Sequence, residues 1–114
     1  MTDQLEEIKK GFVENTLKEL SCLRSVLTET DNKDKEVSKI EMVEKVFMAM
    51  HAICGTAPVV GFEHLVPLSR KLEIVFDQIR KGEKQFSEQI NVQTLRGIDA
   101  LISELSRHSE SVVY

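Results

Sequence analysis

One histidine in this chain of 114 residues stands among small side chains. Cys54 and Gly55 follow His51 by three and four residues, in a stretch whose sequence predicts a helix. Residues at these spacings are neighbours on one helix face, and neither side chain is large enough to cover an imidazole ring. Glycine in a helix costs about 1 kcal/mol relative to alanine, so its position calls for a reason. Clearance for another protein above the ring is one reason, and close helix packing is the other.

An uncovered imidazole can act as a nucleophile. The neutral ring keeps a lone pair on one nitrogen and a proton on the other. A carboxylate that accepts this proton would fix the tautomer and support the positive charge that develops during group transfer. Metal binding is the weaker alternative, because His51 and Cys54 supply two ligands where a structural site needs about four, and we predict no metal site. His64 and His108 lack such surroundings, so we expect them to be solvated and without a role.

Four helices are expected to position these residues. Apolar residues recur at steps of three and four, which indicates amphipathic helices, and no stretch alternates apolar and polar residues long enough to indicate a sheet. The predicted helices cover about 3–27, 35–57, 65–81 and 87–105. Joined by short loops, they favour an all-α, up-down-up-down antiparallel four-helix bundle. We expect one domain over 1–114, with its core at about 3–105 and the tail from about Ser106 frayed.

Particular residues mark the ends and faces of these helices. Proline at 58 should end the second helix, glycine at 82 the third, and Ser87 should cap the fourth. The segment TETDNKDKE (28–36) is rich in turn formers and is expected to be an exposed connection. The predicted core stripes include Leu5 and Ile8 in the first helix. In the second helix they include Ile40, Val43, Phe47, Met50 and Cys54.

Composition excludes several classes of protein. The hydrophobic fraction of 41% with 30% charged residues is typical of a soluble globular domain. A net charge of -4 argues against a nucleic-acid binder. No apolar run reaches the roughly 20 residues of a membrane span, and the first residues are too charged for a signal peptide, so we expect a cytoplasmic protein with reduced cysteines. The chain has no glycine-rich nucleotide loop, so it is not expected to be a kinase or another enzyme.

A set of residues from the second helix to the third carries a resemblance to a known family. The set comprises His51, Ile53, Gly55, Thr56, Ala57, Gly61-Phe62 and Leu72-Glu73. This pattern resembles the histidine-containing phosphotransfer (HPt) domain, and most closely the phosphotransfer domain of chemotaxis histidine kinases. The resemblance implies that His51 is the phosphoacceptor and that Glu73 hydrogen-bonds its imidazole. It also implies two partners, a histidine kinase catalytic domain and a response-regulator receiver domain whose aspartate exchanges the phosphoryl group with His51.

The sequence departs from this family at one position. The family usually has lysine three residues after the histidine, where this chain has Cys54. Arg70 and Lys71 are the candidates to supply the missing cation at the phosphoryl and receiver contact, together with Cys54 and Gly55. If neither does, transfer would be slower, or the chain would be a non-catalytic docking module that binds receivers without accepting phosphate. In both cases we expect a monomer without a cofactor of its own, and a divalent metal in the partner receiver.

Overall fold

The computed structural model describes the backbone of residues 2–29 and 36–112, and the side chains of 4–29 and 39–108. The described chain consists of helices without a strand, which confirms the predicted all-α class. The four α-helices are α1 (Thr2–Thr28), α2 (Glu36–Thr56), α3 (Val66–Arg80) and α4 (Glu88–Val112). A short 3-10 helix, η1 (Glu63–Leu65), precedes α3.

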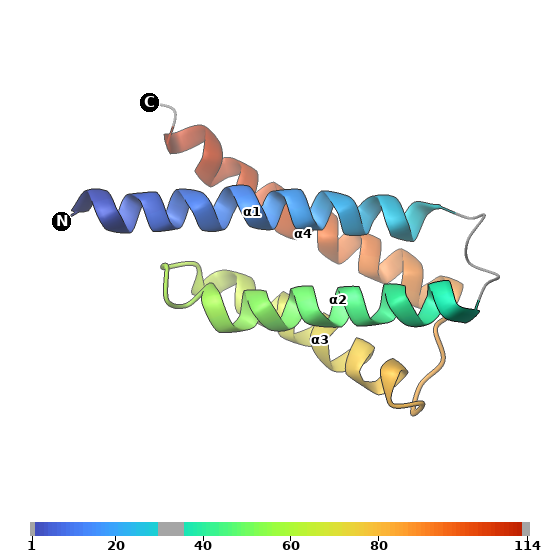
Figure 1. The fold of residues 1–114 in the computed structure, drawn as a ribbon. Coiled ribbons are helices and arrows are strands. Elements are labelled where there is room, and N and C mark those ends of the chain that lie inside the picture. The colour runs from blue at the N-terminus through green and yellow to red at the C-terminus, as the bar shows by residue number, and fades with distance from the viewer. Residues whose placement is uncertain (1, 30–35, 113–114) are drawn as a thin grey trace.

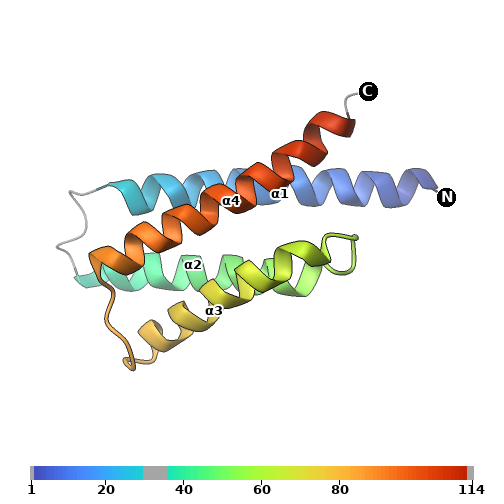
Figure 2. The ribbon, with the colours of Figure 1, turned by 180° about the vertical axis from the view of Figure 1, so that it is seen from behind.

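The four α-helices alternate in direction, up, down, up and down, and form the predicted antiparallel four-helix bundle. In Figure 1, α1 and α2 lie side by side, with α4 behind α1 and α3 behind α2. Figure 2 shows the same arrangement from behind, with α4 and α3 in front. The most extensive contacts join α2 to α3 and α1 to α4. The α2–α3 border is therefore the place where side chains from the second and third helices can meet.

A single hydrophobic core fills the space between the helices. Each helix contributes apolar side chains that are almost completely buried, among them Leu20, Leu27, Val46, Met50, Phe76, Ile98 and Leu105. Gly97 lets α4 approach α3 closely, because a Cβ atom at this position would lie 3.0 Å from Cδ1 of Leu72. Burial of such side chains stabilises the fold by roughly 1.5–3 kcal/mol each. This packing holds α2 and α3 in a fixed relation to each other.

The predicted boundary residues act as expected. After Thr56 the chain turns at Pro58, and Gly61 adopts a φ of +90° before η1. The α3 helix ends in a Schellman motif, in which the Glu83 amide donates to the Gln78 carbonyl and Gly82 has a φ of +81°. Ser87 caps α4, since its Oγ accepts a hydrogen bond from the Ile90 amide at 3.2 Å.

Several predictions at the ends of helices are wrong. Leu5, Ile8 and Ile40 were placed on core stripes, but all three are exposed. The tail does not fray from Ser106, because α4 continues to Val112. Most of the connection predicted at 28–36 lies outside the described residues. None of the described helices has both the length and the apolar content needed to cross a membrane.

Candidate functional site

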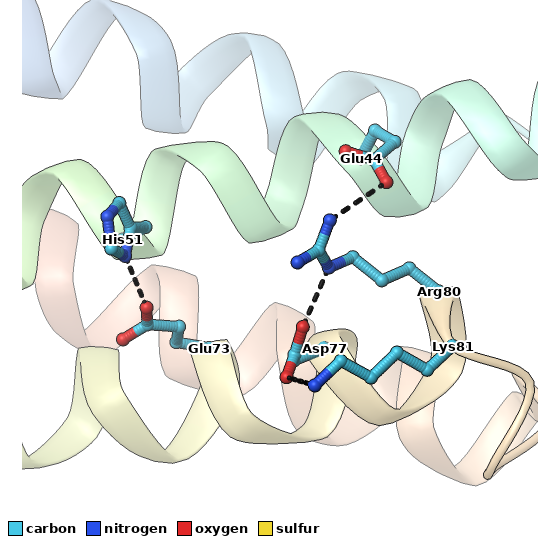
Figure 3. Close-up of polar contacts among 6 residues, drawn as sticks. All are labelled: Glu44, His51, Glu73, Asp77, Arg80 and Lys81. Atoms are coloured by element: carbon cyan, nitrogen blue, oxygen red, sulfur yellow. Dashed lines mark hydrogen bonds and ion pairs between the residues drawn. The ribbon is translucent and has the colours of Figure 1, made fainter.

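His51 projects from α2 into solvent and is held by a carboxylate from α3. Its Nδ1 atom lies 2.5 Å from Oε2 of Glu73 (Figure 3). The side chain of His51 is 66% exposed, whereas that of Glu73 is 17% exposed. The imidazole therefore stands on the surface, and its carboxylate partner is set back between the two helices.

This contact determines which nitrogen of His51 is free. A carboxylate can only accept a hydrogen bond, so Nδ1 carries the proton and donates a hydrogen bond to Glu73. In the neutral ring the lone pair then belongs to Nε2, on the opposite edge of an exposed imidazole. Such a nitrogen can attack an electrophile brought by another molecule, while Glu73 supports the positive charge that develops on the ring.

Cys54, three residues after His51, faces the same carboxylate. Burial, a hydrogen bond to Glu73 and the negative charge of Glu73 together raise the pKa of the Cys54 thiol from its ordinary value of 9.0 to about 11. The positive charge of Arg70 acts in the opposite direction. At neutral pH the thiol is therefore protonated, and it donates to Glu73 rather than supplying a charge for a phosphoryl group.

The two predicted cation donors differ in their position on α3. Arg70 lies one turn before Glu73 on the same face, and its effect on the pKa of Cys54 places its charge near the site. Lys71 lies two residues before Glu73, which is about 200° around the helix. Arg70 is therefore better placed than Lys71 to bring a positive charge near His51, because Lys71 lies on a different face of α3.

Gly55 stands in open space beside the site. An added Cβ atom at this position would meet no atom of the described chain within 4 Å. Close helix packing, the alternative reason for this glycine, therefore does not apply among the described residues. Gly97 differs in this respect, because it packs against Leu72.

Phe47 and Arg80 also belong to this surface, although sequence reasoning did not assign them to it. The ring of Phe47 stacks on the imidazole of His51, with centroids 5.8 Å apart and an interplanar angle of 16°. The Arg80 guanidinium carbon lies 4.0 Å from the centroid of the Phe47 ring. The spacing of four residues between Phe47 and His51 could have indicated that the two rings are neighbours on α2. Phe47 was assigned only to the core stripe instead.

His64 and His108 lie elsewhere, and the prediction for His108 is wrong. Its ring is half-buried and meets that of Phe62 edge-on, with centroids 4.5 Å apart. His64 is exposed as expected, with Nε2 3.6 Å from Oε2 of Glu104. The contact between His108 and Phe62 was not predicted, because the chain was expected to fray from Ser106 and His108 lies beyond that residue. Among the side chains that the structure describes, no group of three or more His, Cys, Asp or Glu residues could hold a metal ion.

Known proteins with similar sequences include a chemotaxis protein and a sensor histidine kinase. The chain is 29% identical over 97 residues, 85% of its length, to the chemotaxis protein CheA of Rhizobium meliloti (strain 1021). It is 25% identical over 99 residues, 87% of its length, to the sensor histidine kinase CheAY of Helicobacter pylori (strain ATCC 700392 / 26695). These similarities confirm the predicted resemblance to chemotaxis histidine kinases.

The similarity covers only a small part of each relative, because the chain spans 12% of the length of both. No family model matches the chain. No solved structure matches it either.

Proposed function

We propose that this chain is a phosphoryl carrier of two-component signalling. His51 accepts a phosphoryl group and exchanges it with the aspartate of a response-regulator receiver domain. The observation that carries the proposal is the exposed imidazole whose Nδ1 donates to Glu73, which leaves Nε2 as the nucleophile. The similarity to CheA and CheAY supports a phosphotransfer domain of this kind in general.

The transfer follows from the geometry of His51 and Glu73. The lone pair on Nε2 attacks the phosphorus of an aspartyl phosphate, and an N–P bond forms as the P–O bond to the aspartate breaks. The aspartate carboxylate leaves with the electron pair of that bond, and the imidazole takes up positive charge. Glu73 stabilises that charge through the Nδ1 proton. The reverse reaction returns the phosphoryl group to a receiver, and a divalent metal in the receiver would neutralise the phosphoryl oxygens.

The surface around His51 suits a protein partner. Met48, one turn before His51, is 58% exposed, and Ala52 and Gly55 are exposed small residues beside it. Methionine is enriched in the middle of protein interfaces, and the small side chains of Ala52 and Gly55 leave room for a partner above His51. We propose a receiver domain and a histidine kinase catalytic domain as the partners, with the chain acting as a monomer in the cytoplasm.

A transfer assay tests the proposal. The chain is incubated with a panel of receiver domains that have first been phosphorylated with acetyl phosphate, and separately with phosphoramidate as a small donor. The label should be acid-labile and base-stable, as a phosphoramidate bond is, and His51→Gln should abolish it. Label that persists in His51→Gln would refute the assignment of His51.

The second candidate function is a docking module that binds receivers without accepting phosphate. The specific observation in its favour is Cys54, whose protonated thiol brings no cation to the place of the family's lysine. The docking function predicts that calorimetry detects receiver binding and that no donor labels the chain. The carrier function predicts both receiver binding and labelling.

A further inference from the structure

A second side chain besides Glu73 contacts the His51 imidazole. Phe47 lies one helical turn before His51 on α2, and the two rings stack with an interplanar angle of 16°. The stack occupies a face of the imidazole and leaves both nitrogen edges open. Nδ1 can therefore reach Glu73 while Nε2 stays exposed.

Glu73 alone does not determine the plane of this imidazole. A single hydrogen bond allows the ring to swing about the line between Nδ1 and Oε2, and the His51 side chain is 66% exposed. A swing of this kind changes the direction of the Nε2 lone pair without breaking the contact to Glu73. Nucleophilic attack requires alignment of the reacting orbitals, so the orientation of the plane affects the rate.

Phe47 is in turn held by a side chain that is anchored from two helices. The Arg80 guanidinium lies over the Phe47 ring at 4.0 Å. Figure 3 shows that this guanidinium reaches Asp77 on its own helix and Glu44 on α2. Its Nε is 2.7 Å from Asp77 and its Nη1 is 3.6 Å from Glu44.

The charges around Arg80 reinforce this anchor. Hydrogen bonds from Lys81 and Arg80 lower the pKa of Asp77, and the hydrogen bond to Asp77 raises that of Arg80. Both groups therefore remain charged across the neutral range. The guanidinium lies over the Phe47 ring, which in turn stacks on the His51 imidazole.

We propose that Phe47, held in place by Arg80, is a positioning residue that fixes the plane of the His51 imidazole and directs Nε2 toward the incoming phosphoryl group. The role rests on the proposed function of His51 as phosphoacceptor. Phe47 touches neither the phosphoryl group nor the receiver in this proposal. It acts only through the imidazole.

Phe47→Leu tests this role, because leucine keeps the apolar bulk and removes the flat ring. Phosphorylation of His51 by phosphoramidate, in which Nε2 displaces ammonia from phosphorus, should slow about two- to tenfold, the range expected for loss of one aromatic pair. In the NMR spectrum the ring-current shift on the His51 protons should disappear. The order parameter of the imidazole ring should fall because its plane is no longer held, while the ¹⁵N shifts should still show the proton on Nδ1 because the contact to Glu73 is kept.

The chain offers a matched control and a rescue variant. Phe12 on α1 is also half-buried and stacks on Phe62, with centroids 5.6 Å apart, in a pair that includes neither His51 nor Glu73. Phe12→Leu should therefore lower stability in urea by a similar amount without changing the phosphorylation rate or the His51 spectrum. Phe47→Tyr keeps the ring and should retain the wild-type rate. Arg80→Met, which removes the anchor, should show a smaller version of the Phe47→Leu effect and replaces that variant if it fails to fold.

The outcomes separate this inference from the proposed function. A wild-type chain that takes no label from any donor refutes the proposed function, and the NMR readout still decides whether Phe47 orients the imidazole. If the wild type is labelled, and Phe47→Leu shows the same rate and the same order parameter of the His51 ring as Phe12→Leu, the positioning role is overturned. A slowed Phe47→Tyr would overturn it as well.

Discussion

Replacing Gly55 with alanine should make the bundle more stable and receiver docking weaker. Alanine lowers the backbone entropy of the unfolded chain, and the structure leaves open space around the position where the new methyl group would stand. The same methyl group lies one turn after His51, on the surface that a receiver would cover. The two effects therefore have opposite signs and can be measured separately.

The magnitudes follow from this environment. Gly55 is in the last turn of α2, so the gain in unfolding free energy should be about 0.5–1 kcal/mol, or roughly 2–4 °C in Tm. An extra methyl group in a tightly packed interface costs about 1–3 kcal/mol. Transfer from a phosphorylated receiver should accordingly show an affinity that is weaker by about 5- to 150-fold.

Urea unfolding and transfer kinetics at varied receiver concentration measure the two effects. Gly11→Ala is the matched control, since a Cβ atom there also meets no described atom within 4 Å and lies on α1. It should raise stability and leave transfer unchanged. Phosphoramidate should label Gly55→Ala at the wild-type rate, because a small donor needs no clearance. Unimpaired transfer from a receiver to Gly55→Ala would refute the clearance argument.

Three further predictions concern individual side chains. Glu73→Gln should slow phosphorylation of His51 by about tenfold through loss of one charge-assisted hydrogen bond, and an unchanged rate in the label assay would remove Glu73 from the mechanism. Because the pKa of Cys54 is raised to about 11, its thiolate fraction at pH 8 should be about 100-fold below that of a thiol of pKa 9.0. Alkylation by iodoacetamide, measured by mass spectrometry, should therefore be slow in the folded chain and keep accelerating up to about pH 11. It should become faster in Glu73→Gln. Equal alkylation rates in the folded and the urea-unfolded chain would contradict this. Gly97→Ala should lower the free energy of unfolding in urea by about 1 kcal/mol. The new Cβ atom would lie 3.0 Å from Cδ1 of Leu72, and this overpacking exceeds the gain in helix propensity. A stabilised variant would show that Leu72 can move aside.

Local chemistry in the sequence was enough to predict the helices and most of their ends. Ser87 and Gly82 act within a few residues of themselves, through a side-chain cap and a left-handed turn, so their effect does not depend on the rest of the fold. The apolar period likewise identifies a helix face. It does not show how far along a helix the neighbouring helices extend, which is why Leu5, Ile8 and Ile40 were wrongly placed in the core.

The site was predictable only in part for a related reason. The resemblance to a phosphotransfer domain led to His51 and Glu73, which the structure brings into contact. The core stripe of α2 correctly includes Phe47, which packs against the core, but the pattern does not show that the same ring also stacks on His51. The position of Arg80 depends on carboxylates from two helices, which no pattern within one helix reveals.

The proposed mechanism is tested most directly by identifying which nitrogen of His51 carries the phosphoryl group. NMR of ¹⁵N-labelled chain, phosphorylated by a receiver, distinguishes a phosphoryl group on Nε2 from one on Nδ1 through coupling to phosphorus. The hydrogen bond from Nδ1 to Glu73 predicts that the group is on Nε2, with Nδ1 still protonated. A phosphoryl group on Nδ1 would contradict the role given to Glu73, and an unphosphorylated ring would contradict the function itself.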